Sequence, residues 1–106
     1  MPKAFLVVRA IVADPAKRAA FYDWYRREHL PDAIKAFGAE KGWRFWSVTD
    51  PSAHQATYQF ADQAAAEAVL GSAGLKAMVA KFERMWPGIP RTREIFTLVD
   101  ERDASA

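Results

Sequence analysis

The sequence contains no cysteine and no asparagine among its 106 residues. Without cysteine, the chain cannot form disulfides, hold metals through thiolates or use a thiol nucleophile. Its longest apolar run, residues 4–8, is far shorter than the roughly 20 residues of a membrane-spanning helix. No signal peptide is recognisable, so we expect a cytoplasmic protein without a membrane partner.

Several other features of binding proteins are scarce or absent. The net charge of +2 is small and dispersed, which argues against a nucleic-acid partner. There is no glycine-rich phosphate loop, Walker motif or serine elbow, so nucleotide-dependent chemistry is not expected. The two histidines, His29 and His54, do not have the spacing of metal ligands, and we predict neither a metal nor a bound organic cofactor.

The order of predicted elements defines the fold class. Four segments have the composition of strands, residues 3–12, 43–49, 54–60 and 91–99. A helix follows Asp14-Pro15 and is predicted to end or kink near His29, because Pro31 lacks an N–H group. Two further helical segments, 62–70 and 75–86, precede the last strand. The order βαββαβ predicts an α+β, ferredoxin-like domain with a four-stranded antiparallel sheet over residues 1–99, followed by a polar tail, 100–106.

The two helices of such a βαββαβ fold can cover only one face of the sheet. The first strand is apolar on both sides, with Phe5, Val7 and Ile11 on one side and Leu6 and Val8 on the other. An uncovered face of this kind predicts a homodimer that packs sheet against sheet.

The candidate catalytic residues lie on one helical stripe. Phe21, Tyr25 and His29 are spaced by four residues, so they share a face. An imidazole at a helix end can exchange a proton near neutral pH, and the alternative is a structural histidine that bonds the last carbonyls. We predict that His29, with Tyr25 and Tyr58, lines a cavity between the helix and the sheet.

Other residues are candidates for ligand binding. His54 opens the third strand and is either a solvated edge residue or part of the site. Arg9 either forms a cross-strand salt bridge with Glu94 or anchors a ligand in the helix–sheet cleft. Aromatic residues are 13% of the chain and must be buried in a core, an interface or a flat apolar pocket. The candidates for such a pocket are Phe21, Trp24, Trp43, Trp46 and Trp86.

The stretch Phe21-x-x-x-Tyr25-x-x-x-His29-x-Pro31 after a first strand resembles the EthD-like family of the dimeric α/β-barrel superfamily. Residues 58–62 and the closing Phe96-Thr97 extend this resemblance. It implies a homodimer whose two sheets form a shared barrel, and a small-molecule pocket in each subunit. Relatives include cofactor-free antibiotic-biosynthesis monooxygenases, muconolactone isomerases, polyketide cyclases and proteins associated with ether degradation. The family's helix-end histidine falls on His29 and its inward aromatic residue on Tyr25.

The departures from this family limit the reaction. A mechanism that needs cysteine is impossible, and an oxygenase site of the Asn/Trp/His kind lacks its asparagine. Two hypotheses therefore remain. One is a cofactor-independent oxygenase, isomerase or cyclase acting on a small aromatic, phenolic or lactone compound, with His29 as general acid/base. For oxygenation the substrate anion must be stabilised, and Arg9 is the nearest candidate. The other is a non-catalytic ligand-binding or stress-response barrel.

Overall fold

Four antiparallel strands form one sheet in a computed structural model that describes residues 2–105. Residues 1 and 106, the ends of the predicted domain and tail, lie outside the described residues. The strands are β1 (Ala4–Ile11), β2 (Lys41–Trp46), β3 (Ala53–Phe60) and β4 (Arg91–Thr97). Their order in the sheet is β2-β3-β1-β4, and every neighbouring pair is antiparallel. This confirms the predicted ferredoxin-like α+β fold.

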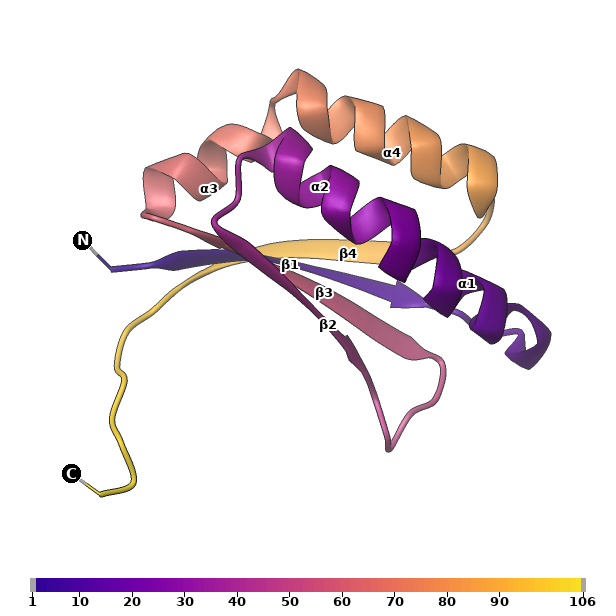
Figure 1. The fold of residues 1–106 in the computed structure, drawn as a ribbon, viewed down its shortest axis with the longest axis horizontal. Coiled ribbons are helices and arrows are strands. Elements are labelled where there is room, and N and C mark those ends of the chain that lie inside the picture. The colour runs from indigo at the N-terminus through magenta and orange to yellow at the C-terminus, as the bar shows by residue number, and fades with distance from the viewer. Residues whose placement is uncertain (1, 106) are drawn as a thin grey trace.

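All helical segments lie on one face of this sheet (Figure 1). A continuous helical stretch follows β1, and two helices follow β3. The segments are η1 (Pro15–Lys17), α1 (Arg18–Trp24), η2 (Tyr25–His29), α2 (Leu30–Phe37), α3 (Gln63–Leu70) and α4 (Ala73–Met85). Because these segments occupy one face, the other sheet face has no helical cover.

Short polar side chains begin these helical segments. The Asp14 carboxylate accepts a hydrogen bond from the backbone N–H of Ala16 at 3.0 Å, and Pro15 takes the first helical position. The Asp62 carboxylate accepts from the N–H of Ala65 at 2.9 Å, as the sequence predicts. The Ser72 hydroxyl caps α4, which begins at Ala73, so Gly74 lies inside the helix rather than before it.

Side-chain alternation along β1 decides which residues are buried. Leu6 and Ala10 face the helices and are fully buried. Phe5 and Arg9 face the uncovered side, because each is displaced by one residue from the buried set. The same alternation in β2 places Phe45 on the uncovered face, where its side chain is 53% exposed, and Phe96 of β4 is 47% exposed.

The last residues of the described chain leave the sheet. After Thr97 no helix or strand is present up to residue 105, and the segment extends away from the body (Figure 1). No helix within residues 2–105 has the length and apolar character needed to cross a membrane.

Gly74 allows α4 to approach α2 closely. A Cβ atom at this position would overlap the carbonyl oxygen of Ala36, which is rigid backbone. Gly74→Ala is therefore expected to lower the free energy of unfolding by about 1–3 kcal/mol, the usual cost of overpacking. Gly71→Ala is the matched control, because no atom lies within 4 Å of a Cβ there. Urea denaturation of both variants measures the difference, and equal stabilities would contradict the close approach.

Candidate functional site

The helix that carries His29 does not end at this residue. Tyr25–His29 form one π turn, in which the Leu30 N–H donates to the carbonyl of Tyr25, and the helix continues through Pro31 to Phe37. Of the two predicted alternatives, an end or a kink near His29, the end is therefore wrong, and the irregularity of the helix at this point is a π turn. The physical reason is that a wider turn shifts the hydrogen-bond register just where Pro31 has no N–H to donate. Single π turns of this kind occur frequently at functional sites.

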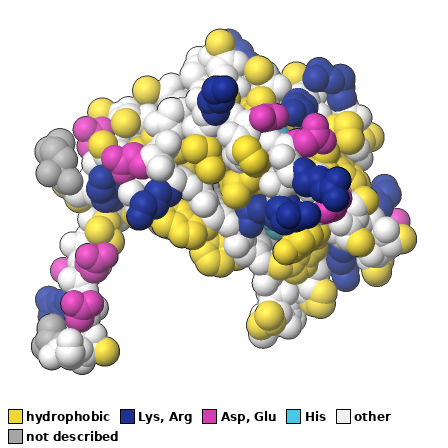
Figure 2. Space-filling view, in the orientation of Figure 1, with side chains coloured by type: hydrophobic (Ala, Val, Ile, Leu, Met, Phe, Trp, Pro, Cys, Tyr) yellow, Lys and Arg dark blue, Asp and Glu magenta, His cyan; other side chains and the backbone are white. Residues whose placement is uncertain are grey.

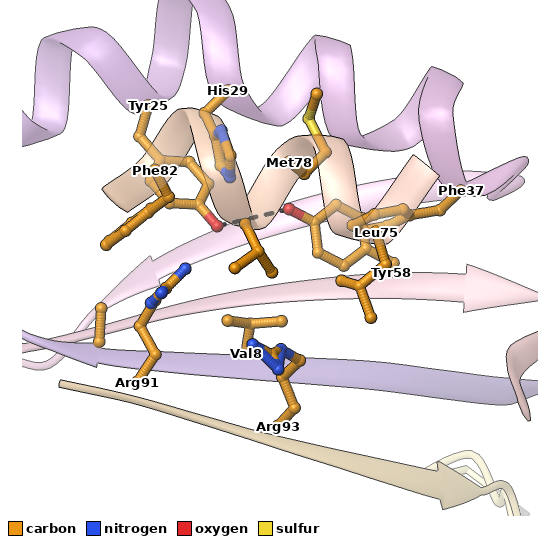
Figure 3. Close-up of a pocket in the computed structure, with 12 residues that line it drawn as sticks. Val8, Tyr25, His29, Phe37, Tyr58, Leu75, Met78, Phe82, Arg91 and Arg93 are labelled. Atoms are coloured by element: carbon orange, nitrogen blue, oxygen red, sulfur yellow. Dashed lines mark hydrogen bonds between the residues drawn. The ribbon is translucent and has the colours of Figure 1, made fainter. Parts of the chain in front are cut away.

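Beneath the π turn lies a cavity between the helices and the sheet. Its volume is about 30 Å³, enough for a water molecule or two. Helix side chains form one wall, and side chains of β1, β3 and β4 form the other (Figure 3). The lining residues are Val8, Ala10, Tyr25, His29, Phe37, Tyr58, Leu75, Met78, Val79, Phe82, Arg91 and Arg93. His29, Tyr25 and Tyr58 thus meet at one cavity.

The two tyrosine hydroxyls form a pair inside this cavity. The Tyr25 and Tyr58 oxygens lie 3.4 Å apart, and both side chains are buried (Figure 3). Burial raises the pKa of Tyr25 and holds the pKa of Tyr58 well above its ordinary value. Both phenols are therefore protonated at neutral pH and can donate hydrogen bonds to a bound oxygen atom.

The His29 imidazole is buried among aromatic rings. It is 6% exposed and stacks on Trp24, with ring centres 4.6 Å apart. Its Nδ1 atom is buried without a hydrogen-bond partner, while the ring projects toward the cavity (Figure 3). Burial, and then the positive charges of Lys81 and Arg91, lower the pKa of His29 to about 4. The ring is neutral at pH 7 and can accept a proton.

Two arginines supply the positive charge of the cavity wall. Arg91 and Arg93 project from β4 on the helix-facing side, because they pair with Ala10 and Val8 of β1. The Arg91 guanidinium lies 4.0 Å from the centre of the Phe82 ring and forms an ion pair with Glu83. Sequence reasoning missed both arginines. Their alternation in the last strand was the available signal, but it does not say which side faces the helices.

Arg9 lies on the opposite face of the sheet, so its predicted position in the helix–sheet cleft is wrong. Its Nε donates to Gln55 at 3.0 Å, on the uncovered face. The predicted salt bridge with Glu94 is also not formed, because the β1–β4 register places Thr92 opposite Arg9 and Val7 opposite Glu94. Trp43 faces the same uncovered side, opposite Thr57, and so does not line the cavity either.

The remaining predicted residues surround the cavity without lining it. Phe21, Trp24 and Trp86 pack against one another beside His29. His54 is 1% exposed and packs against Trp46, with ring centres 5.2 Å apart. His54 is therefore not a solvated edge residue. Only slivers of histidine surface are visible in Figure 2, beside Lys and Arg side chains. Residues 2–105 contain no cluster of three His, Cys, Asp or Glu side chains suited to a metal ion.

Comparison with known proteins identifies the fold. No family model and no curated protein matches the sequence. Among solved structures, the chain is similar to an ethyl tert-butyl ether D (EthD) family protein of Bacillus halodurans, with 16% identity and a TM-score of 0.72, over 92% of this chain and 99% of that one. A dimeric ferredoxin-like protein from an uncultured marine organism has 20% identity and a TM-score of 0.72, over 96% and 100%. SnoaB, a cofactor-independent oxygenase of Streptomyces nogalater, has 14% identity and a TM-score of 0.69, over 95% and 97%. The fold implied by the EthD-like resemblance is thus confirmed.

Proposed function

We propose that the protein is a cofactor-independent enzyme that binds a small phenolic or enolic compound in the helix–sheet cavity and removes its acidic proton. The observation that carries this proposal is the convergence of a neutral imidazole, two protonated tyrosines and an arginine on one cavity. These groups can accept a proton and stabilise the oxyanion that its removal leaves behind.

His29 is the proton acceptor in this proposal. The ligand O–H bond breaks, its proton moves to the free imidazole nitrogen of His29, and its electron pair stays on the ligand oxygen. Arg91 and the hydroxyls of Tyr25 and Tyr58 stabilise the resulting anion. In the empty cavity burial, and then the positive charges of Lys81 and Arg91, lower the pKa of His29 to about 4. A bound anion offsets these charges and raises the pKa, so base strength increases when the ligand is present.

The fate of the anion defines the reaction type. Isomerisation needs a proton returned to a carbon atom of the anion, and cyclisation needs the anion to attack an electrophilic carbon of the same molecule before the proton is returned. Oxygenation needs O₂ as a second substrate that the anion reduces. An oxygenase reaction is supported by the similarity in fold to SnoaB, a cofactor-independent oxygenase, and to a putative antibiotic biosynthesis monooxygenase of Nitrosomonas europaea. Proton removal is the step that all three reaction types share.

The small volume of the cavity favours a second candidate function, non-catalytic ligand binding. At about 30 Å³ the cavity does not admit a ring-sized ligand without movement of its wall. Leu75 and Met78 of α4 form part of that wall, and Met has the flexibility to adapt to a ligand. A protein of this second kind would bind the compound without changing its ionisation.

Ionisation of 4-nitrophenol distinguishes the two functions, because its phenolate absorbs visible light. With saturating protein, its pKa is expected to fall by at least one unit, equivalent to about 1.4 kcal/mol of preference for the anion. His29→Gln should abolish this shift, while His54→Gln, at a histidine that does not line the cavity, should retain it. Binding with an unchanged pKa would favour the non-catalytic function, and no binding would contradict both.

The uncovered sheet face supports a homodimer. Ile11, Phe45 and Phe96 expose apolar surface on this face or at its edge strand, and one protein of the same fold is described as dimeric. Packing two such faces together would remove this surface from water and form the shared barrel. The ligand cavity lies on the other side of the sheet, so each subunit would retain its own site.

Sedimentation at micromolar concentration tests the dimer. The expected mass is twice the chain mass of 11.9 kDa. Phe45→Glu places a charge on the uncovered face and should shift the protein toward monomers by at least about tenfold in dissociation constant. Leu70→Glu is the matched control, because Leu70 is similarly exposed but lies on α3. A wild-type monomer at micromolar concentration would contradict the proposed interface.

A further inference from the structure

A second hollow lies beside β2, and neither the cavity nor the proposed reaction uses it. We call its inner part the Arg44 groove. This groove has a volume of about 90 Å³ and is lined by Tyr22, Arg44, Phe45, Trp46 and His54. An open depression of about 290 Å³ adjoins it, sharing Tyr22 and Trp46 and adding Arg18, Ala19 and Pro51. None of the residues of the Arg44 groove lines the helix–sheet cavity.

Arg44 lacks a partner for part of its guanidinium group. Its Nε donates to Nε2 of His54 at 3.1 Å, but its Nη2 is buried and has no hydrogen-bond partner. Within residues 2–105, no carboxylate forms an ion pair with Arg44. The rings of Tyr22 and Tyr25 lie near the charge, with their centres 4.6 Å and 5.2 Å from the guanidinium carbon. A buried, charged donor without an acceptor is unfavourable, so this site favours an anion.

His54 presents the same requirement. Because its Nε2 accepts from Arg44, the ring proton of the neutral imidazole is on Nδ1. This Nδ1 is also buried without a partner. Both unpaired groups of the Arg44–His54 pair are therefore donors, and an additional cation would only increase the repulsion. What the pair lacks is an acceptor with negative charge.

The outer part of the hollow is aromatic. The rings of Tyr22 and Trp46 have centres 6.3 Å apart, and the Trp46 indole is held in place by a hydrogen bond from its N–H to the carbonyl of Pro51. Tyr22 is half exposed. A planar apolar body can lie against these rings while a charged group reaches inward to Arg44.

We propose that the Arg44 groove is a binding site for a small aromatic carboxylate, with the carboxylate on the Arg44 guanidinium and the ring against Tyr22 and Trp46. The inner volume of about 90 Å³ fits a carboxylate, and the adjoining depression has room for the ring. Planar bidentate recognition of carboxylates is the usual chemistry of an arginine of this kind. This site does not depend on the proposed proton transfer at His29.

Titration of the whole protein with benzoate tests this site, observed by NMR at the Trp46 indole N–H. Benzoate is expected to give a saturable shift of this resonance, and benzamide, which has a similar shape but no charge, should bind at least about tenfold more weakly. Arg44→Gln should weaken benzoate binding at least about tenfold. Arg91→Gln, which removes one of the two arginines of the helix–sheet cavity, should leave benzoate binding unchanged.

Further measurements test binding at the Arg44 groove. If Arg44→Gln does not fold, Arg44→Lys keeps the charge without the planar pair of donors and should also lose affinity. Saturating 4-nitrophenol should not displace benzoate, because the two sites have no lining residue in common. Non-saturable benzoate shifts, equal affinity for benzamide, or loss of binding in Arg91→Gln but not in the Arg44 variants would overturn the proposal.

Discussion

Replacing Phe21 by alanine is expected to lower the free energy of unfolding by about 3–5 kcal/mol, as for other fully buried phenylalanines. Phe21 is 0% exposed and lies at the centre of the aromatic cluster. Its ring packs edge-on against His54, Trp86 and Phe82, with centre-to-centre distances of 5.2, 5.3 and 5.9 Å. Alanine would leave a cavity that these large rings cannot fill without losing their own contacts.

Urea denaturation measures this effect, with the neighbouring Tyr22→Ala as control. Tyr22 is half exposed, so its truncation should change the free energy of unfolding by no more than about 1 kcal/mol. A loss below about 1 kcal/mol for Phe21→Ala would show that the cluster is not the centre of the core.

Acidification from pH 7 to pH 5 is expected to destabilise the protein by about 4 kcal/mol through its two histidines. Burial is the main cause that lowers the pKa of His29 to about 4 and of His54 to about 3, from an ordinary value of 6.5. The unfolded chain therefore binds protons between pH 6.5 and 4 that the folded chain does not. The free energy of unfolding is therefore highest above pH 6.5, where both imidazoles are neutral in either state. It decreases as the pH falls toward 4 and then 3, by about 2 kcal/mol per imidazole at pH 5.

Unfolding free energies measured between pH 7 and 5 test this dependence. His54→Gln retains an acceptor for Arg44 and removes one titrating group, so the slope against pH should fall by about half. Glu40 and Asp50 have lowered pKa values as carboxyl groups, and their contributions are lost only below their ordinary values of 4.5 and 3.8. A free energy that does not change between pH 7 and 5 would contradict neutral, buried imidazoles.

The order of elements could be read from the sequence because each signal is local. Asp62 precedes a helix and caps it, and Pro15 follows Asp14 at a helix start. The second strand was predicted over residues 43–49 but ends at Trp46. The Ser47 hydroxyl accepts from the N–H of Asp50 and so begins the turn earlier. The same hydroxyl also accepts from the N–H of Thr49, so this boundary depends on the side-chain hydrogen bonds of one serine, which composition does not reveal.

The facing of the strands could not be read from the sequence. The first strand is apolar on both sides, and β4 has polar residues on both sides, so alternation alone leaves the buried face open. Arg9 and Trp43 therefore remain candidates for a cleft that they do not face, and Arg91 and Arg93 are missed. The spacing of Tyr25 and His29 was sufficient to place both at one cavity, although the π turn that carries them was not foreseen.

Nitrogen-15 NMR of the His29 ring at pH 7 tests the central claim most directly, because it reports the protonation state of the proposed base. In the free protein the ring is expected to be neutral, since its pKa lies at about 4. With saturating 4-nitrophenol the same ring should be protonated while the bound ligand is the phenolate. A ring that stays neutral beside bound nitrophenol, or that is already charged in the free protein, would contradict the account.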